Sequence, residues 1–234
     1  MKKFLVLFIL LFGLTAQADV MEVEQISDMP HFWEQNGRPE QKVLEVGAKI
    51  INANKLDKRI PINLDRNSKI INAFSSMPRK TVTIYYGILP YFDNDDELAY
   101  VLSHEMAHSL DAYGGPFKWI KMVYNSKEYE FKADLIGIDL MVKAGYNPIA
   151  AICTANKWMG ESYWDFWIFT THPKTSRRLL KMYEYIYVKY PWALKTDMVK
   201  NLNYQNFLYS SQKEVNAFLQ HQKERSSKQK TEDI

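Results

Sequence analysis

Residues 93–116, DNDDELAYVLSHEMAHSLDAYGGP, form the stretch that decides the fold of this chain. Asp93 or Asn94 can cap a helix here, and acidic residues follow in the first turn, where the helix dipole favours negative charge. Apolar residues recur at helical spacing, and the Gly-Gly-Pro at 114–116 stops the pattern. The sequence therefore predicts one well-defined helix across this stretch.

Two histidines of this helix, His104 and His108, are four residues apart. That spacing puts both imidazoles on one helix face, where they can reach the same metal ion. Glu105 follows the first histidine and can project towards a metal-bound water. The HExxH pattern thus supplies two zinc ligands and a general base, whereas the simpler interpretation is a pair of hydrogen-bonded, partly buried histidines.

A catalytic zinc ion needs a third protein ligand and an open position for water. Glu130 is the preferred candidate because Asp134 lies four residues on, on the same face of the next predicted helix. Asp134 could then accept a hydrogen bond from the distal N–H of a ligating histidine. Glu128 competes for the ligand role, and the other histidines of the chain are His31, His172 and His221.

The N-terminus is typical of a cleavable secretory signal. Residues 1–18, MKKFLVLFILLFGLTAQA, combine two lysines, a short apolar run and an Ala-x-Ala ending. The apolar run is shorter than the roughly 20 residues that span a bilayer, so an uncleaved anchor is the weaker interpretation. We expect cleavage after Ala18 and export to the bacterial periplasm. Membrane contact remains possible, but the mature chain should not be integral to the membrane.

The composition fits one folded globular domain. The chain has 234 residues, of which 47% are hydrophobic and 24% charged, with a formal net charge of +3. This weak charge gives no basis for a nucleic-acid partner. Cys153 is the sole cysteine, which excludes a disulfide framework and a cysteine-based zinc site.

Periodicity predicts the other elements in outline. Expected helices cover 39–54, 127–144, 148–159, 175–190 and 211–224, and strand-like runs cover 59–64, 69–74 and 81–86. Residues 225–234 are polar, and we expect them to be frayed. The aromatic loop at 163–169 could grip apolar clients or pack in the core.

Three ordered motifs resemble metallopeptidase family forty-eight: HEMAH at 104–108, EFKAD at 130–134 and THPKTSRR at 171–178. That family includes the HtpX peptidases, the CAAX prenyl endopeptidases and periplasmic proteases that degrade misfolded outer-membrane proteins. The sequences NAF at 72–74 and AGYNP at 144–148 also match its pattern.

The resemblance implies an α+β, zincin-like gluzincin fold, mostly helical, with a small three-stranded sheet. The edge strand of that sheet, expected at 81–86, would flank the HExxH helix. By the same resemblance, His172 would lie near the metal and assist catalysis, and Arg178 would orient Glu130 or Asp134. The expected division is a signal peptide at 1–18, a metallopeptidase domain at 19–205, and a C-terminal helix with a polar tail at 206–234.

The predicted function is a periplasmic endopeptidase with one zinc ion per chain. His104, His108 and Glu130 would hold the metal, and Glu105 would act as general base. Unfolded or misfolded proteins are the expected substrates, and outer-membrane assembly proteins are possible partners. Two alternatives are a periplasmic chaperone or adaptor with a latent zinc site, and a binding protein with a structural zinc site.

Overall fold

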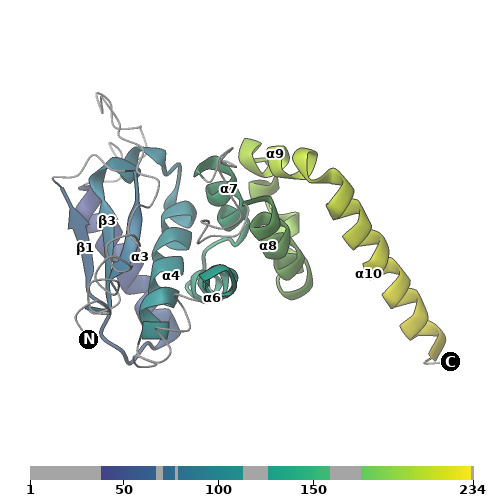
Figure 1. The fold of residues 1–234 in the computed structure, drawn as a ribbon, viewed down its shortest axis with the longest axis horizontal. Coiled ribbons are helices and arrows are strands. Elements are labelled where there is room, and N and C mark those ends of the chain that lie inside the picture. Colours follow the sequence, from purple (N-terminus) through teal and green to yellow (C-terminus); the bar gives the residue numbers. More distant parts are fainter. Residues whose placement is uncertain (1–37, 67–70, 77–78, 113–125, 159–174, 233–234) are drawn as a thin grey trace, which may run out of the picture.

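The computed structural model describes residues 38–66, 71–76, 79–112, 126–158 and 175–232, which fold as an α+β protein (Figure 1). The strands are β1 (Ile62–Asp65), β2 (Ala73–Ser76) and β3 (Thr81–Tyr85). The α-helices are α3 (Pro39–Asn54), α4 (Asp95–Ala112), α6 (Ser126–Lys143), α7 (Ile149–Trp158), α8 (Thr175–Lys189), α9 (Leu202–Ser210) and α10 (Gln212–Glu232). Short 3-10 helices occupy η1 (Tyr86–Tyr91), η2 (Pro191–Lys195) and η3 (Asp197–Lys200).

The predicted α+β class is confirmed, and most predicted helices lie within a residue or two of their expected bounds. Two regions of the C-terminal part differ. Helix α9 was not expected, and α10 continues to Glu232 through residues predicted to be frayed. Its final turns are rich in Lys, Gln and Glu, which are good helix formers.

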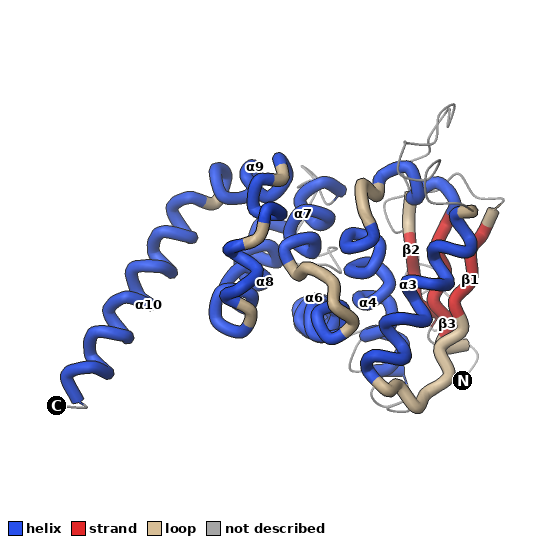
Figure 2. Tube along the Cα trace, turned by 180° about the vertical axis from the view of Figure 1, so that it is seen from behind, coloured by secondary structure: helices blue, strands red, loops and turns tan. Residues whose placement is uncertain are grey.

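The order of the strands corrects one prediction. The described sheet runs β1-β3-β2, so β3 lies in the centre and is not the edge strand expected at 81–86. β3 pairs in parallel with β1 and antiparallel with β2. The strand that contacts α4 from the sheet's edge is β2, as the arrangement in Figure 2 also shows. Strand order could not be read from the sequence because the parallel partner of β3 lies about 20 residues earlier in the chain.

Helix α4 begins at Asp95, directly after the predicted capping residue Asn94. The side chain of Asn94 accepts a hydrogen bond from the backbone N–H of Glu97 at 3.0 Å, and the Glu97 carboxylate accepts one from Asp93 N–H at 3.0 Å. These contacts satisfy donors that the first helical turn leaves free. The start of α4 at Asp95 is therefore fixed nine residues before the first histidine of the motif.

Helix α4 lies at the centre of the molecule. The sheet and α3 contact it on one side, and α6 and α7 contact it on the other (Figure 1). Among the described elements, α4 and α6 share the most extensive contact. Apolar side chains of α4 that are wholly buried, such as Leu98, Leu102 and Met106, fix its rotation. That rotation turns the HExxH face towards α6 and the free edge of β2, the side of that strand on which no described strand pairs.

Aromatic side chains hold the C-terminal helices together. Tyr183 lies with its ring centroid 5.7 Å from that of Phe207 and 6.0 Å from that of Phe218, and Tyr187 lies 5.3 Å from Phe218. This cluster fixes the first turns of α10 against α8 and α9, and accounts for some of the 14% of residues that are aromatic. Beyond it, α10 extends away from the body of the molecule (Figure 1). None of the described helices has the length and apolar character needed to cross a membrane.

Candidate metal centre

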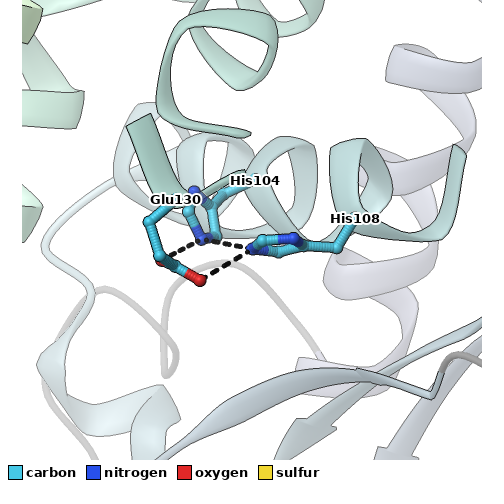
Figure 3. A group of neighbouring side chains, drawn as sticks. All are labelled: His104, His108 and Glu130. Atoms are coloured by element: carbon cyan, nitrogen blue, oxygen red, sulfur yellow. Dashed lines mark hydrogen bonds and ion pairs between the residues drawn. The ribbon is translucent and has the colours of Figure 1, made fainter. Parts of the chain in front are cut away.

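Two adjacent helices bring three potential ligands together. His104 and His108 project from α4, and Glu130 faces them from α6 (Figure 3). The Nε2 atoms of the two histidines are 3.2 Å apart. Glu130 spans both rings, with Oε2 3.5 Å from Nε2 of His104 and Oε1 3.2 Å from Nε2 of His108.

These three distances fit a tetrahedral zinc site. Nitrogen and oxygen ligands bind zinc at about 2.0–2.2 Å, so two ligands at a tetrahedral angle lie about 3.4 Å apart. The two histidine nitrogens are close to this value at 3.2 Å, and each lies 3.2–3.5 Å from a different oxygen of the Glu130 carboxylate. The donor set, two imidazoles and one carboxylate, also matches the ligands of known catalytic zinc sites. Among the described residues, these three side chains therefore fit one zinc ion.

Asp134 supports His104 from behind. Its Oδ1 lies 3.0 Å from Nδ1 of His104, the ring nitrogen that points away from Glu130, although the N–H is not well aligned for a linear hydrogen bond. Arg178, from α8, donates to both oxygens of Asp134, at 2.6 and 2.8 Å. Tyr100 donates its hydroxyl to Oδ1 at 2.9 Å. One buried carboxylate thus ties three helices together at the back of the site.

Charge explains how this carboxylate stays ionised. Burial alone would raise the pKa of Asp134, but the charge and hydrogen bonds of Arg178 hold the pKa below its usual range. An ionised carboxylate can only accept hydrogen bonds, so Tyr100 must donate to it. The Nδ1 proton of His104 is favoured for the same reason, which leaves Nε2 free to bind a cation.

The carboxylates also act on the protonation of His104 itself. Burial alone would lower its pKa, but the contacts with Asp134 and Glu130 outweigh that effect and raise the pKa to about 10. Without a metal ion, His104 therefore carries a second proton at neutral pH. A metal ion that binds at Nε2 must displace that proton.

Glu105 lies beside the ligands and does not join them. Burial raises the pKa of its carboxyl group, while the two histidines and a hydrogen bond from the backbone N–H of Ser75 oppose the shift. A raised pKa is suited to a group that takes and returns a proton near neutral pH. Ser75 belongs to β2, so this contact connects the candidate base to the edge of the sheet.

The free edge of β2 faces this base. Tyr85 N–H donates to the carbonyl of Asn72 at 3.1 Å, so Asn72 and Tyr85 form a hydrogen-bonded pair of the antiparallel ladder. Because such pairs alternate, the main-chain groups of Ala73 and Ser75 point away from β3. The N–H of Ala73 is held by the side chain of Asn72 at 2.8 Å. The carbonyls of Ala73 and Ser75 therefore point towards the space next to Glu105.

The other predicted site residues divide into three groups. Arg178 lies at the site and contacts both Asp134 and Glu130, the latter at 3.4 Å. Glu128 and His221 are exposed, and His221 lies on the projecting helix α10. His31, His172, the aromatic loop at 163–169 and the expected signal peptide at 1–18 lie outside the described residues.

Sequence reasoning missed two residues at the site, Tyr100 and Gly137. Tyr100 is four residues before His104, and Gly137 is seven residues after Glu130, so each shares a helix face with a predicted ligand. Helical spacing was the available signal. It could not show which of the many residues on those faces meet the opposite helix.

The sequence of this chain is similar to those of known peptidases. The family model described as peptidase family M48 matches residues 37–112 and 118–186, more than half of the chain. The chain is also similar to the mitochondrial metalloendopeptidase OMA1 of Arabidopsis thaliana, with 26% identity. That match covers 48% of this chain and 29% of the plant protein, so the chain matches less than a third of its relative's length.

Proposed function

The chain belongs to peptidase family M48, and on that premise we propose that it is a zinc-dependent endopeptidase. One observation carries the proposal: two histidine nitrogens and a carboxylate from two helices converge, with one potential ligand atom from each residue within 4.8 Å of the others. The neighbouring carboxylate of Glu105 adds a proton acceptor to that centre. A purely structural zinc site would have four protein ligands and would not need this base.

When bound, the zinc ion supplies a Lewis acid that lowers the pKa of water and polarises the scissile carbonyl. Each residue then has a defined task. His104, His108 and Glu130 hold the ion, and Asp134 fixes the ring of His104 with help from Arg178. Glu105 accepts the proton of the attacking water and passes it to the nitrogen of the leaving amine.

The peptide would bind in extended form along the free edge of β2. This position replaces the one expected along 81–86, since β3 is covered by a neighbouring strand on each side. Main-chain pairing with the carbonyls of Ala73 and Ser75 would give affinity that tolerates many sequences. It would also place the scissile bond next to Glu105, which already contacts this strand.

We further propose that the protein acts in the bacterial periplasm on unfolded or misfolded envelope proteins, with outer-membrane assembly proteins as possible partners. The support is the signal-like character of residues 1–18 and the sequence tolerance of an edge-strand site. Cell fractionation with N-terminal sequencing tests the location, and a mature N-terminus at Asp19 is expected. A cytoplasmic protein with an intact N-terminus would contradict it.

The catalytic proposal is tested with Glu105→Gln. We expect the turnover of unfolded casein to fall by about 10²–10⁴-fold, the usual contribution of a general base, with bound zinc unchanged at one ion per chain. The matched control is Glu128→Gln, an exposed glutamate on α6 that should leave turnover unchanged. Chelation should abolish turnover in all three proteins, and zinc should restore it in the wild type and the control.

A binding and cleavage assay distinguishes the peptidase from the main alternative, a chaperone or adaptor. A chaperone or adaptor with a latent site would bind a urea-denatured outer-membrane β-barrel protein without cutting it. Binding without cleavage by zinc-loaded wild type would favour that alternative. Full activity of Glu105→Gln would contradict the proposed mechanism.

A further inference from the structure

Helices α4 and α6 pack backbone against backbone at Gly137. A Cβ atom at this position would lie 3.0 Å from the backbone nitrogen of His104, 3.1 Å from its Cα and 3.3 Å from the carbonyl carbon of Ser103. Ordinary Cβ contacts are 3.4–4 Å. The obstructing atoms belong to the backbone in the middle of a helix, so they cannot rotate aside as a side chain can.

The same face of α6 carries the metal-site carboxylates. Glu130, Asp134 and Gly137 are spaced at i, i+4 and i+7, which aligns them along one stripe of the helix. With a rise of about 1.5 Å per residue, Gly137 lies about 4.5 Å along the axis from Asp134 and about 10 Å from Glu130. The tight contact at Gly137 is thus within two turns of both carboxylates, and the backbone of His104 itself forms it.

Metal–ligand distances tolerate less change than the separation of α4 and α6 that a side chain at position 137 would force. An alanine at 137 would require α4 and α6 to separate by a few tenths of an ångström. Metal–ligand distances vary by only about 0.2 Å in well-formed sites. Moving α6 would therefore carry Glu130 away from the histidines and loosen the contact between Asp134 and His104.

Helix propensity also makes a glycine at position 137 unusual. Glycine is unfavourable in a helix interior compared with alanine, because it loses more backbone freedom on folding. Gly137 lies in the middle of α6, well before the turn at Gly145, where a φ of 82° itself favours glycine. A glycine at 137 therefore has a local cost that packing must offset.

We propose that Gly137 is a positioning residue of the metal centre: its lack of a side chain lets α6 hold Glu130 and Asp134 at the correct distance from His104. The assignment rests on the proposed metal-dependent function. Helix propensity alone predicts that Gly137→Ala stabilises α6. The proposal predicts that the same substitution weakens metal binding.

The test measures metal binding directly, using the full chain stripped of metal. Zinc and cadmium affinities are determined by competition with a chromophoric chelator, and circular dichroism and urea unfolding are recorded without metal. The matched control is Gly47→Ala in α3. Gly47 is also a buried helical glycine, but a Cβ there would meet the terminal methyl of Ile62, a flexible side chain that can turn aside.

We expect Gly137→Ala to weaken zinc binding by about 10–100-fold, the usual cost of disturbing the supports of a metal ligand, and Gly47→Ala to change it less than twofold. We also expect the preference for zinc over cadmium to fall in Gly137→Ala, because the larger ion accepts longer ligand distances. This ratio is independent of the fraction of protein that is folded, since both affinities scale with that fraction equally.

Three results would overturn the assignment. The first is a Gly137→Ala protein with wild-type zinc affinity and an unchanged zinc-to-cadmium ratio. The second is a Gly137→Ala chain that does not fold with or without metal, because the glycine would then serve the whole fold. The third is a wild-type protein that binds neither ion, which would also remove the proposed metal centre; the first two results leave that centre intact.

Discussion

Carboxylates are buried at both ends of α4, but their positively charged partners differ. At the N-terminal end, the wholly buried Glu97 receives a hydrogen bond from Lys157 at 2.9 Å, and Lys157 also reaches Asp93 at 2.6 Å. At the other end, the carboxylates of Glu105, Glu130 and Asp134 converge around two histidines. Arg178 supplies one positive charge to this second group.

The difference separates a structural cluster from one suited to a metal ion. Burial raises the pKa of Glu97 despite its contact with Lys157, whereas Arg178 lowers the pKa of Asp134 although that side chain is also buried. The first cluster fastens α4 to α7 with a cation of its own. The second places three carboxylates around one guanidinium and two imidazoles. A divalent cation that displaces the extra proton of His104 is attracted by the carboxylates that remain.

The largest effect is expected at the metal end. Arg178→Met removes a 4% exposed guanidinium and leaves Asp134 buried without its main counter-charge. Breaking a buried pair in this way should lower the free energy of unfolding by about 3–5 kcal/mol, measured by urea unfolding of the metal-free protein. The exposed neighbour variant Arg177→Met is the control and should change it by less than about 0.5 kcal/mol. Similar values for the two variants would contradict the role given to Arg178.

A smaller effect is expected at the N-terminal end. Lys157→Met leaves the carboxylate of Glu97 with the Asp93 N–H as a remaining donor, and should cost about 2 kcal/mol by urea unfolding. The cost is lower than for Arg178 because the Lys157 side chain is 17% exposed and its partner Asp93 is 58% exposed, so water screens part of the interaction.

The same Lys157→Met variant should bind zinc within twofold of wild type, because its cluster lies about 10 Å along α4 from the histidines. Chelator competition measures this. A tenfold loss of zinc affinity would show that the two ends of the helix are coupled and would remove the contrast between them.

The smallest effect concerns pH. In the folded chain the pKa of Glu97 lies above its ordinary value of 4.5. Between those two values the folded chain holds a proton that the unfolded chain has released, so the contribution of Glu97 to stability increases as pH falls through this window. The free energy of unfolding of wild type minus that of Glu97→Gln should therefore rise from pH 7 towards pH 4.5. A difference that stays constant or falls would mean that burial does not control this group.

Spacing along single helices was enough to identify the candidate ligands. His104 with His108, and Glu130 with Asp134, are pairs four residues apart, and the structure places each pair on one helix face. The caps and periodicity of α4 and α3 likewise appear in the local sequence. These features depend on contacts within one or two turns, which a sequence displays directly.

Features that depend on two distant segments were not accessible in the same way. The central place of β3 results from pairing with β1, and the importance of Gly137 results from the approach of a helix some 30 residues away in the chain. The residues around 81–85 and around 137 do not show which distant segment packs against them. The sequence therefore predicted which residues could bind a metal, and packing alone defined how they are spaced.

The strand order β1-β3-β2 also constrains how the chain folds. β1 and β2 come first in the sequence, but each pairs with β3 and not with the other. Neither can form its ladder until residues 81–85 insert between them, so the sheet is gained or lost as a unit. A proline at Ile84 would remove a ladder donor from the strand on which both others depend. The edge that faces Glu105 would then disappear with the rest of the sheet, although no residue of that edge had been altered.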